Sequence, residues 1–250
     1  MAINALIILI IVFLLTSMVG VVTGSNSLIS VPVMFQFGIE PRVAIATNMF
    51  GLVFMSIGGT IPFLGKDTIK YAKITPFIIL TTISSAIGAL LVGIISNQGI
   101  KLIVSIAMIT VAIFSLLKRN AGVGADHEPV KHAVPITYFL VFLLGIYGGL
   151  FSGGYTTILT AVCVGIYGMQ YTEAIASTKL INVFSSLIAT LLFMWQGLVD
   201  YKLGLILGAT MFVGAYAGAH FVTKLNDVWL RRIFLSTVVL LALKTLYDFI

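Results

Sequence analysis

The sequence predicts an all-α integral membrane protein with about eight transmembrane helices, two short broken or re-entrant helices, and two homologous halves. Composition is the first reason. Hydrophobic residues make up 60% of the 250 residues and charged residues only 9%, whereas a soluble domain carries about 25% charged residues. The other two reasons are the long apolar runs and the similarity between the stretches on either side of one polar segment. Such a chain cannot cover a water-facing surface.

Eight apolar runs approach the length of about 20 residues that a transmembrane helix needs. They cover 2–23, 42–64, 72–96, 102–118, 134–153, 172–195, 202–223 and 230–249. The first run has no basic segment before it, so we expect a permanent span and not a signal peptide. Two shorter runs, 25–38 and 155–168, would as helices cover about 21 Å of a hydrocarbon core about 30 Å thick. We therefore expect those two to be broken or re-entrant helices.

An internal repeat divides the chain. Shifting the sequence by 130 residues aligns 24–103 with 154–233 without a gap, and fifteen of the 80 pairs are identical. Gly24 then matches Gly154, and Gly38 matches Gly168. Self-similarity at a fixed offset indicates a repeated architecture. We predict a first repeat over 1–118, a central polar loop over 119–133 and a second repeat over 134–250.

Loop charge favours an inverted arrangement of the two repeats. If the short segments do not cross the membrane, the repeats are parallel and the loop cations divide eight to five. If the short segments count as crossings, the repeats are inverted and the cations divide nine to four. The stronger bias fits the excess of Lys and Arg in cytoplasmic loops. The central loop around Asp126 is then cytoplasmic, and Ile250 is not.

The two short segments open on small polar residues that suit a helix break. The first holds Gly24, Ser25, Asn26 and Ser27, and its repeat mate holds Gly153, Gly154, Tyr155, Thr156 and Thr157. Glycine permits a sharp turn, and Ser, Asn and Thr are common N-caps. The N–H groups and positive dipole end of a helix N-terminus suit an anion. These residues are candidate substrate ligands; the alternative is a packing break whose caps are satisfied locally.

A second set of candidate ligands lies within two of the long spans. It comprises Thr47, Asn48, Ser177, Thr178, Lys179 and Asn182. Lys179 lies six residues after Glu173, about 9 Å along a helix, which places it within the apolar layer. A buried ammonium needs a partner, and a bound anion would supply one. The alternative is a lysine that extends to the membrane surface.

Other patterns indicate packing or exclude functions. Small residues four apart, as at Gly214 and Gly218 with Ser84 and Gly88 in the repeat, indicate close helix contact. Paired carboxylates, metal-ligand clusters and phosphate loops are absent from the sequence. We therefore expect no catalytic residue, metal or cofactor. The net charge of +6 comes from cations beside spans and not from a basic stripe, which excludes nucleic acid as a partner.

These residues resemble the TauE/SafE family of sulfite exporters over nearly the whole chain. In the first half the resemblance rests on Gly20, Gly24, Val31-Pro32, Gly38 and Ala44-Ile45-Ala46-Thr47-Asn48. In the second it rests on Gly145, Gly148-Gly149, Ser152-Gly153-Gly154 and Ser177-Thr178-Lys179-Leu180-Ile181-Asn182. The first half departs from the family's usual run of glycines at Ser25 to Ser27. The resemblance implies a membrane transporter of small, mostly sulfur-containing anions such as sulfite or organosulfonates.

The functional prediction is a secondary transporter, with export as the expected direction, in the inner (cytoplasmic) membrane as a multi-pass protein. Its partners are the lipid bilayer, a small anion held between the repeats, and a coupling ion that is either a proton or sodium. Rocking of one repeat against the other would give alternating access. An anion channel is the alternative, and a membrane-embedded enzyme is a weaker one because acids and histidines are not clustered.

Overall fold

The computed structural model describes residues 3–24, 26–64, 68–117 and 133–221. These residues are all-helical, with nine α-helices and a short 3-10 helix, Ile61–Phe63, that follows α3. The α-helices are α1 (Ile3–Thr23), α2 (Ser27–Gln36), α3 (Pro41–Thr60), α4 (Tyr71–Ile94), α5 (Asn97–Leu117), α6 (Ala133–Leu150), α7 (Tyr155–Gly165), α8 (Tyr171–Trp195) and α9 (Tyr201–Phe221).

The helices follow the predicted apolar runs within a few residues, and α2 and α7 are the two short ones. Within the part of the chain that the structure describes, five stretches are long and apolar enough to cross a membrane: Ile3–Val21, Pro41–Phe63, Tyr71–Ile94, Thr172–Trp195 and Tyr201–His220. The chain is therefore a multi-pass membrane protein. The predicted span 230–249 and loop residues 119–132 lie outside the described residues, so the total of eight spans stays a prediction.

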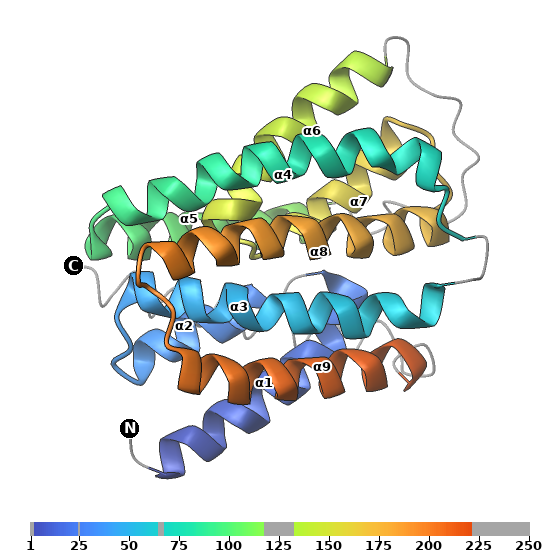
Figure 1. Cartoon of the computed structure of the whole chain (residues 1–250). Coiled ribbons are helices and arrows are strands. Elements are labelled where there is room, and N and C mark those ends of the chain that lie inside the picture. The colour runs from blue at the N-terminus through green and yellow to red at the C-terminus, as the bar shows by residue number, and fades with distance from the viewer. Residues whose placement is uncertain (1–2, 25, 65–67, 118–132, 222–250) are drawn as a thin grey trace.

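Two helices from distant parts of the chain, α3 and α8, lie side by side at the centre (Figure 1). Next to α3 packs α9, which also contacts α1, and next to α8 packs α4, which also contacts α6. Thus α4 packs against helices that follow the central segment, and α9 against helices that precede it. In Figure 1, α3 and α9 run from left to right, while α4 and α8 run from right to left.

Glycines bring these outer helices into close contact, as predicted from their spacing. A Cβ at Gly214 of α9 would stand 2.7 Å from the carbonyl oxygen of Leu14 on α1. A Cβ at Gly88 of α4 would collide with the backbone of Ile146 on α6. Close backbone approach increases the van der Waals contact that holds helices together in lipid. The prediction that these small residues serve packing is confirmed.

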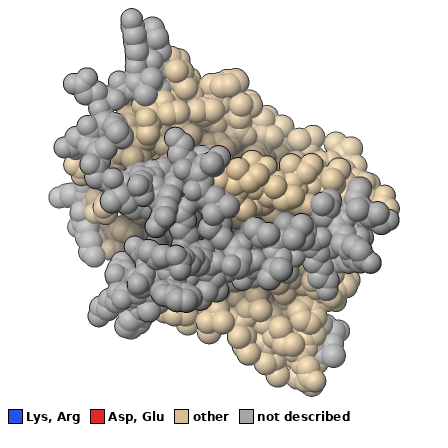
Figure 2. Space-filling model, turned by 180° about the vertical axis from the view of Figure 1, so that it is seen from behind, with Lys and Arg blue, Asp and Glu red and all other residues tan. Residues whose placement is uncertain are grey.

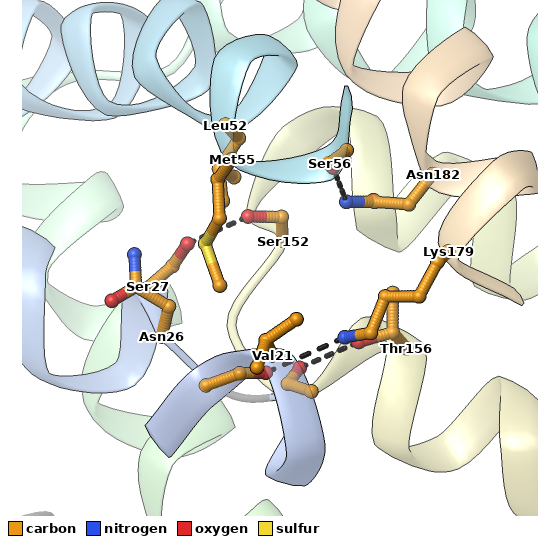
Figure 3. A pocket seen from close by; sticks show the side chains of 12 residues that line it. Val21, Asn26, Ser27, Leu52, Met55, Ser56, Ser152, Thr156, Lys179 and Asn182 are labelled. Carbon is orange, nitrogen blue, oxygen red and sulfur yellow. Dashed lines mark hydrogen bonds between the residues drawn. The ribbon is translucent and has the colours of Figure 1, made fainter. Parts of the chain in front are cut away.

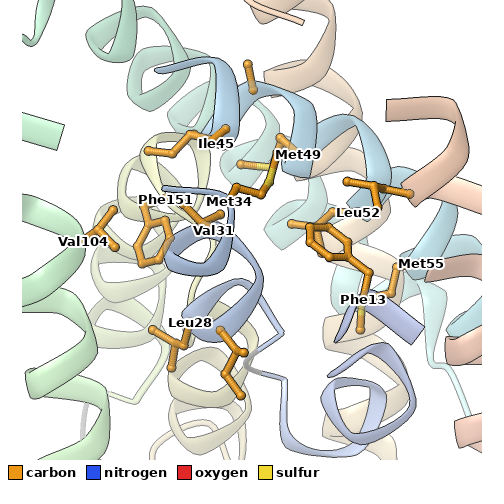
Figure 4. Close-up of a cluster of buried hydrophobic side chains, with 14 of the residues drawn as sticks. Phe13, Leu28, Val31, Met34, Ile45, Met49, Leu52, Met55, Val104 and Phe151 are labelled. Atoms are coloured by element: carbon orange, nitrogen blue, oxygen red, sulfur yellow. The ribbon is translucent and has the colours of Figure 1, made fainter. Parts of the chain in front are cut away.

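The interior and the exterior are both apolar. One buried cluster includes Phe13, Leu28, Met34, Ile45 and Phe151, contributed by α1, α2, α3 and the segment after α6 (Figure 4). On the outside, Ile94 and Trp195 expose 80% and 78% of their surface. Figure 2 shows a face on which no described residue is Lys, Arg, Asp or Glu. Such an exterior fits contact with lipid.

Candidate functional site

A small cavity lies where the two helix breaks meet α3 and α8 (Figure 3). Its volume is about 20 Å³, a little more than one ordered water requires. The cavity in this conformation therefore admits only a very small occupant. It is lined by Gly20, Val21, Gly24, Asn26, Ser27, Leu52, Met55, Ser56, Ser152, Thr156, Lys179 and Asn182.

Glycine shapes both breaks. Gly24 has φ +74° and Gly154 has φ +79°, a left-handed conformation that other residues adopt only at a cost. The chain therefore leaves α1 sharply before α2 begins, and enters α7 in the same way. The expectation that polar side chains cap these starts is wrong at Asn26, which precedes α2 and makes no capping hydrogen bond. Gly154 precedes α7 and has no side chain to contribute.

The two breaks are joined by hydrogen bonds. The Thr156 hydroxyl, in the first turn of α7, donates to the Gly24 carbonyl oxygen at 2.7 Å. The neighbouring Thr157 hydroxyl donates to the Thr23 carbonyl oxygen at 2.5 Å. On the other side of the first break, the hydroxyls of Ser27 and Ser152 lie 2.8 Å apart. Segments about 130 residues apart in sequence therefore form one wall of the cavity.

Lys179 reaches into this cavity from the middle of α8 (Figure 3). It is only 6% exposed, and its Nζ donates to the Gly20 carbonyl oxygen at 3.4 Å. The side chain thus turns inward, toward the end of α1, and does not extend to the exterior. It forms no ion pair with a carboxylate among the described residues. A buried ammonium without a counter-charge is costly, so the cavity favours a negative occupant.

The acid closest in sequence to Lys179 is already paired. Glu173, in the first turn of α8, lies 3.5 Å from the Nζ of Lys70 and 3.7 Å from the Nζ of Lys73. Lys70 directly precedes α4, and Lys73 lies in its first turn. Glu173 therefore ties α8 to α4 at one end of the molecule and does not neutralise the cavity.

A chain of hydrogen bonds orients the serines of the cavity. Ser30 donates to Asn48 Oδ1 at 2.7 Å, and Asn48 Nδ2 donates to Ser27 Oγ at 2.9 Å. Ser27 Oγ accepts from Asn48, and either Ser27 or Ser152 can donate in the hydrogen bond between their hydroxyls. When Ser27 donates, the hydroxyl proton of Ser152 is free for a ligand. Asn48 thus does not line the cavity itself but orients Ser27, which does.

Further donors complete the polar side. Asn182 Nδ2 donates to Ser56 Oγ at 2.6 Å, which leaves the second N–H of the amide and the Ser56 proton available to an occupant. Asn26 is 3% exposed, and neither of its amide atoms has a partner among the described residues. The cavity therefore offers several hydrogen-bond donors, and an occupant rich in acceptors fits it best. Within the described residues there is also no group of three His, Cys, Asp or Glu side chains that would hold a metal.

The model of the family described as "Sulfite exporter TauE/SafE" matches residues 9–245. The chain belongs to the TauE/SafE family. Relatives of the chain carry names that describe them as probable membrane transporters. A "probable membrane transporter protein ORF9" from Sinorhizobium sp is 27% identical, over 91% of this chain and 87% of the relative. No solved structure matches the chain.

Two further relatives cover nearly the full length of the TauE/SafE chain. A "probable membrane transporter protein" from Haemophilus influenzae is 25% identical, over 98% of this chain and 96% of the relative. The "probable membrane transporter protein YfcA" from Escherichia coli K12 is also 25% identical, over 95% of this chain and 88% of the relative. The match thus extends across both predicted repeats.

The structure brings some of the predicted ligands of this TauE/SafE protein together and leaves others apart. Six line the cavity: Gly24, Asn26, Ser27, Thr156, Lys179 and Asn182. Ser25 lies outside the described residues. The other eight do not line it: Thr47, Asn48, Gly153, Gly154, Tyr155, Thr157, Ser177 and Thr178. Several of these have structural partners instead.

Thr47 and Thr178 are two predicted ligands whose hydroxyls have hydrogen-bond partners outside the cavity lining. The Thr47 hydroxyl accepts from the backbone N–H of Asp200 at 3.0 Å, beside the start of α9. The Thr178 hydroxyl lies 3.0 Å from that of Thr160 on α7. The candidate ligands on α8 therefore face different neighbours, and of the four only Lys179 and Asn182 line the cavity.

Six lining residues were not among the predicted ligands: Gly20, Val21, Leu52, Met55, Ser56 and Ser152. Of these, Gly20 and Ser152 belong to the family motifs in the sequence. Two signals in the sequence could have found some of them. Ser56 is identical to its repeat mate Ser186, and Leu52 is the mate of Asn182. No sequence signal indicates the apolar residues Val21 and Met55.

Proposed function

We propose that this protein is a secondary transporter that exports a small, sulfur-containing anion, such as sulfite or an organosulfonate, across the cytoplasmic membrane. Membership of the TauE/SafE family supports the substrate class. The single observation that carries the proposal is the buried Lys179 ammonium, which lines the cavity without an ion-pair partner among the described carboxylates. A bound anion would neutralise it and accept hydrogen bonds from the neighbouring hydroxyl and amide groups.

The proposed mechanism is alternating access between two inverted repeats. Helix starts recur 130 residues apart, at Pro41 and Tyr171 and again at Tyr71 and Tyr201. The corresponding helices α3 and α8 run in opposite directions in Figure 1, as do α4 and α9. Both observations support an inverted repeat, the arrangement common in transporters whose substrate lies between broken helices.

The packing suggests which parts move. In the proposed motion, one body consists of α1, α3 and α9, because α9 packs on α1 and α3. The other consists of α4, α6, α7 and α8, because α4 and α7 both pack on α6 and α8. Each body therefore contains one helix from the other half of the sequence. The hydrogen bonds of Lys179 to Gly20, Thr156 to Gly24 and Asn182 to Ser56 all cross between these two bodies. Rocking would exchange these contacts for contacts to the substrate and would widen a cavity that is now too small for sulfite.

The orientation follows from charge. Lys70 precedes α4 and Lys73 lies in its first turn, and in Figure 1 α4 starts at the end of the molecule where α6 also starts. We assign this end to the cytoplasm because cytoplasmic loops carry an excess of Lys and Arg. A gradient of protons or sodium is proposed to drive export, since transport against a gradient by a chain of this kind needs a coupling ion.

The test is anion flux into and out of liposomes that contain the purified full-length protein. A transporter should give sulfite or sulfonate flux that saturates at low anion concentration and responds to an imposed proton or sodium gradient. Flux that rises linearly with concentration and ignores both gradients would indicate the alternative, an anion channel. No flux above that of empty liposomes for any of these anions would refute the proposal.

A further inference from the structure

The described part of the cavity lining has one ionisable side chain. Among the lining residues that the structure describes, only Lys179 has a group that can carry a charge. The other polar members are Ser, Thr and Asn, which are uncharged. Such a lining can offer one charge-assisted hydrogen-bond donor, from Lys179, beside neutral donors.

Three further cations of the described residues do not line the cavity. Lys70 and Lys73 lie beside Glu173, and the Arg42 guanidinium donates to the Gly93 carbonyl oxygen on α4; none of these residues lines the cavity. The helix ends also offset one another. At the first break the last turn of α1 presents the negative end of its dipole and the first turn of α2 a positive end of about the same size; at the second break the last turn of α6 and the first turn of α7 do the same.

The rest of the described lining brings no second positive charge. Val21, Leu52 and Met55 form an apolar part of the wall, and the polar side chains beside them are neutral. Among the described lining residues, Lys179 is therefore the group that would balance the charge of an anion.

We infer that this site is selective for monovalent oxyanions, such as hydrogen sulfite or a monosulfonate, and excludes divalent oxyanions of the same shape. The inference rests on the proposed function and specifies its substrate by charge. Lys179 sets the charge that is accepted, and the Ser, Thr and Asn side chains bind oxygen atoms. A dianion would leave one negative charge buried and unpaired in a low-dielectric site, which is strongly unfavourable. Its affinity should be at least tenfold lower.

Two anions of one shape provide the test. Fluorosulfate and monofluorophosphate are isoelectronic and tetrahedral, and they differ by one negative charge. Their binding to the full-length protein in detergent would be measured by titration calorimetry, with sulfite and methanesulfonate as reference ligands. We expect fluorosulfate to bind at least tenfold more tightly than monofluorophosphate. If a reference ligand binds but the two probes bind equally, or the divalent probe binds more tightly, or neither probe binds, the inference is overturned. If no reference ligand binds, the proposed function itself fails.

A charge-addition variant tests the same point from the opposite direction. Leu52→Lys places a second ammonium on the lining, and Leu52→Gln is the matched control, which adds polarity without charge. We expect Leu52→Lys to shift the preference toward monofluorophosphate by at least tenfold more than Leu52→Gln does. Equal shifts in both variants would overturn the inference. Should Leu52→Lys fail to fold, the comparison of the two probes on the parent protein still decides.

Discussion

The break at Gly24 provides the sharpest test of how the two ends of the sequence meet. Gly24 has φ +74°, so Gly24→Ala places an L-residue in the left-handed region at a cost of about 1–2 kcal/mol. The added Cβ would also collide with the Thr156 and Thr157 side chains. Both hydroxyls donate to carbonyls at this break, and each lost hydrogen bond costs about 1 kcal/mol. Gly24→Ala should therefore cost about 3–4 kcal/mol.

The chain contains a matched control at Gly38. It has φ +75°, almost the same strain, but a Cβ there would meet no atom within 4 Å. Gly38→Ala should therefore cost only the strain, about 1–2 kcal/mol. The difference of about 2 kcal/mol between the two variants isolates the contact between the breaks.

Equilibrium unfolding of each variant in detergent micelles, followed by circular dichroism against increasing dodecyl sulfate, would measure the two free energies. Liposome flux would be measured in parallel, and only Gly24→Ala should lose it. Equal destabilisation by Gly24→Ala and Gly38→Ala would mean that the two breaks do not touch as described. The two breaks would then not meet at the cavity.

Three other predictions follow from the site and the topology. Lys179→Met should fold, because it removes a costly buried charge, but anion affinity measured by calorimetry should fall at least tenfold, about 1.4 kcal/mol. Lys179→Arg should lose less affinity. The control Lys202→Met, which changes an exposed lysine, should lose none. Unchanged binding by Lys179→Met would remove the lysine from the site. Asn48→Ala breaks the hydrogen bonds to both of its serine partners and should cost about 2 kcal/mol in the same unfolding assay; a loss below 0.5 kcal/mol, roughly the smallest net hydrogen bond, would contradict that role. Reporter fusions at Asp126 and Ile250 should give a cytoplasmic and a non-cytoplasmic signal, and signals on the same side would exclude the inverted arrangement.

The sequence by itself determined the class of the protein and the places of its helices. With 9% charged residues, the chain has too few polar groups for a water-facing surface, and lipid requires each spanning segment to satisfy its own backbone hydrogen bonds. Apolar runs therefore become helices with nearly the predicted bounds. Glycine at Gly24 and Gly154 marked the breaks, because few other residues accept the backbone conformation found there. The cost of burying a charge singled out Lys179.

Only the tertiary structure decided which side chains share the cavity. In a water-soluble protein an apolar stripe shows which face of a helix is buried, but a helix in lipid is apolar on most sides, so periodicity does not show its inner face. Thr47 and Ser56 both belong to α3, yet Thr47 contacts Asp200 and Ser56 lines the cavity. Packing of α9 on α3 and of α8 on α3 sets these faces. Contacts between segments so far apart in the sequence depend on the shapes of both surfaces, which local composition does not encode.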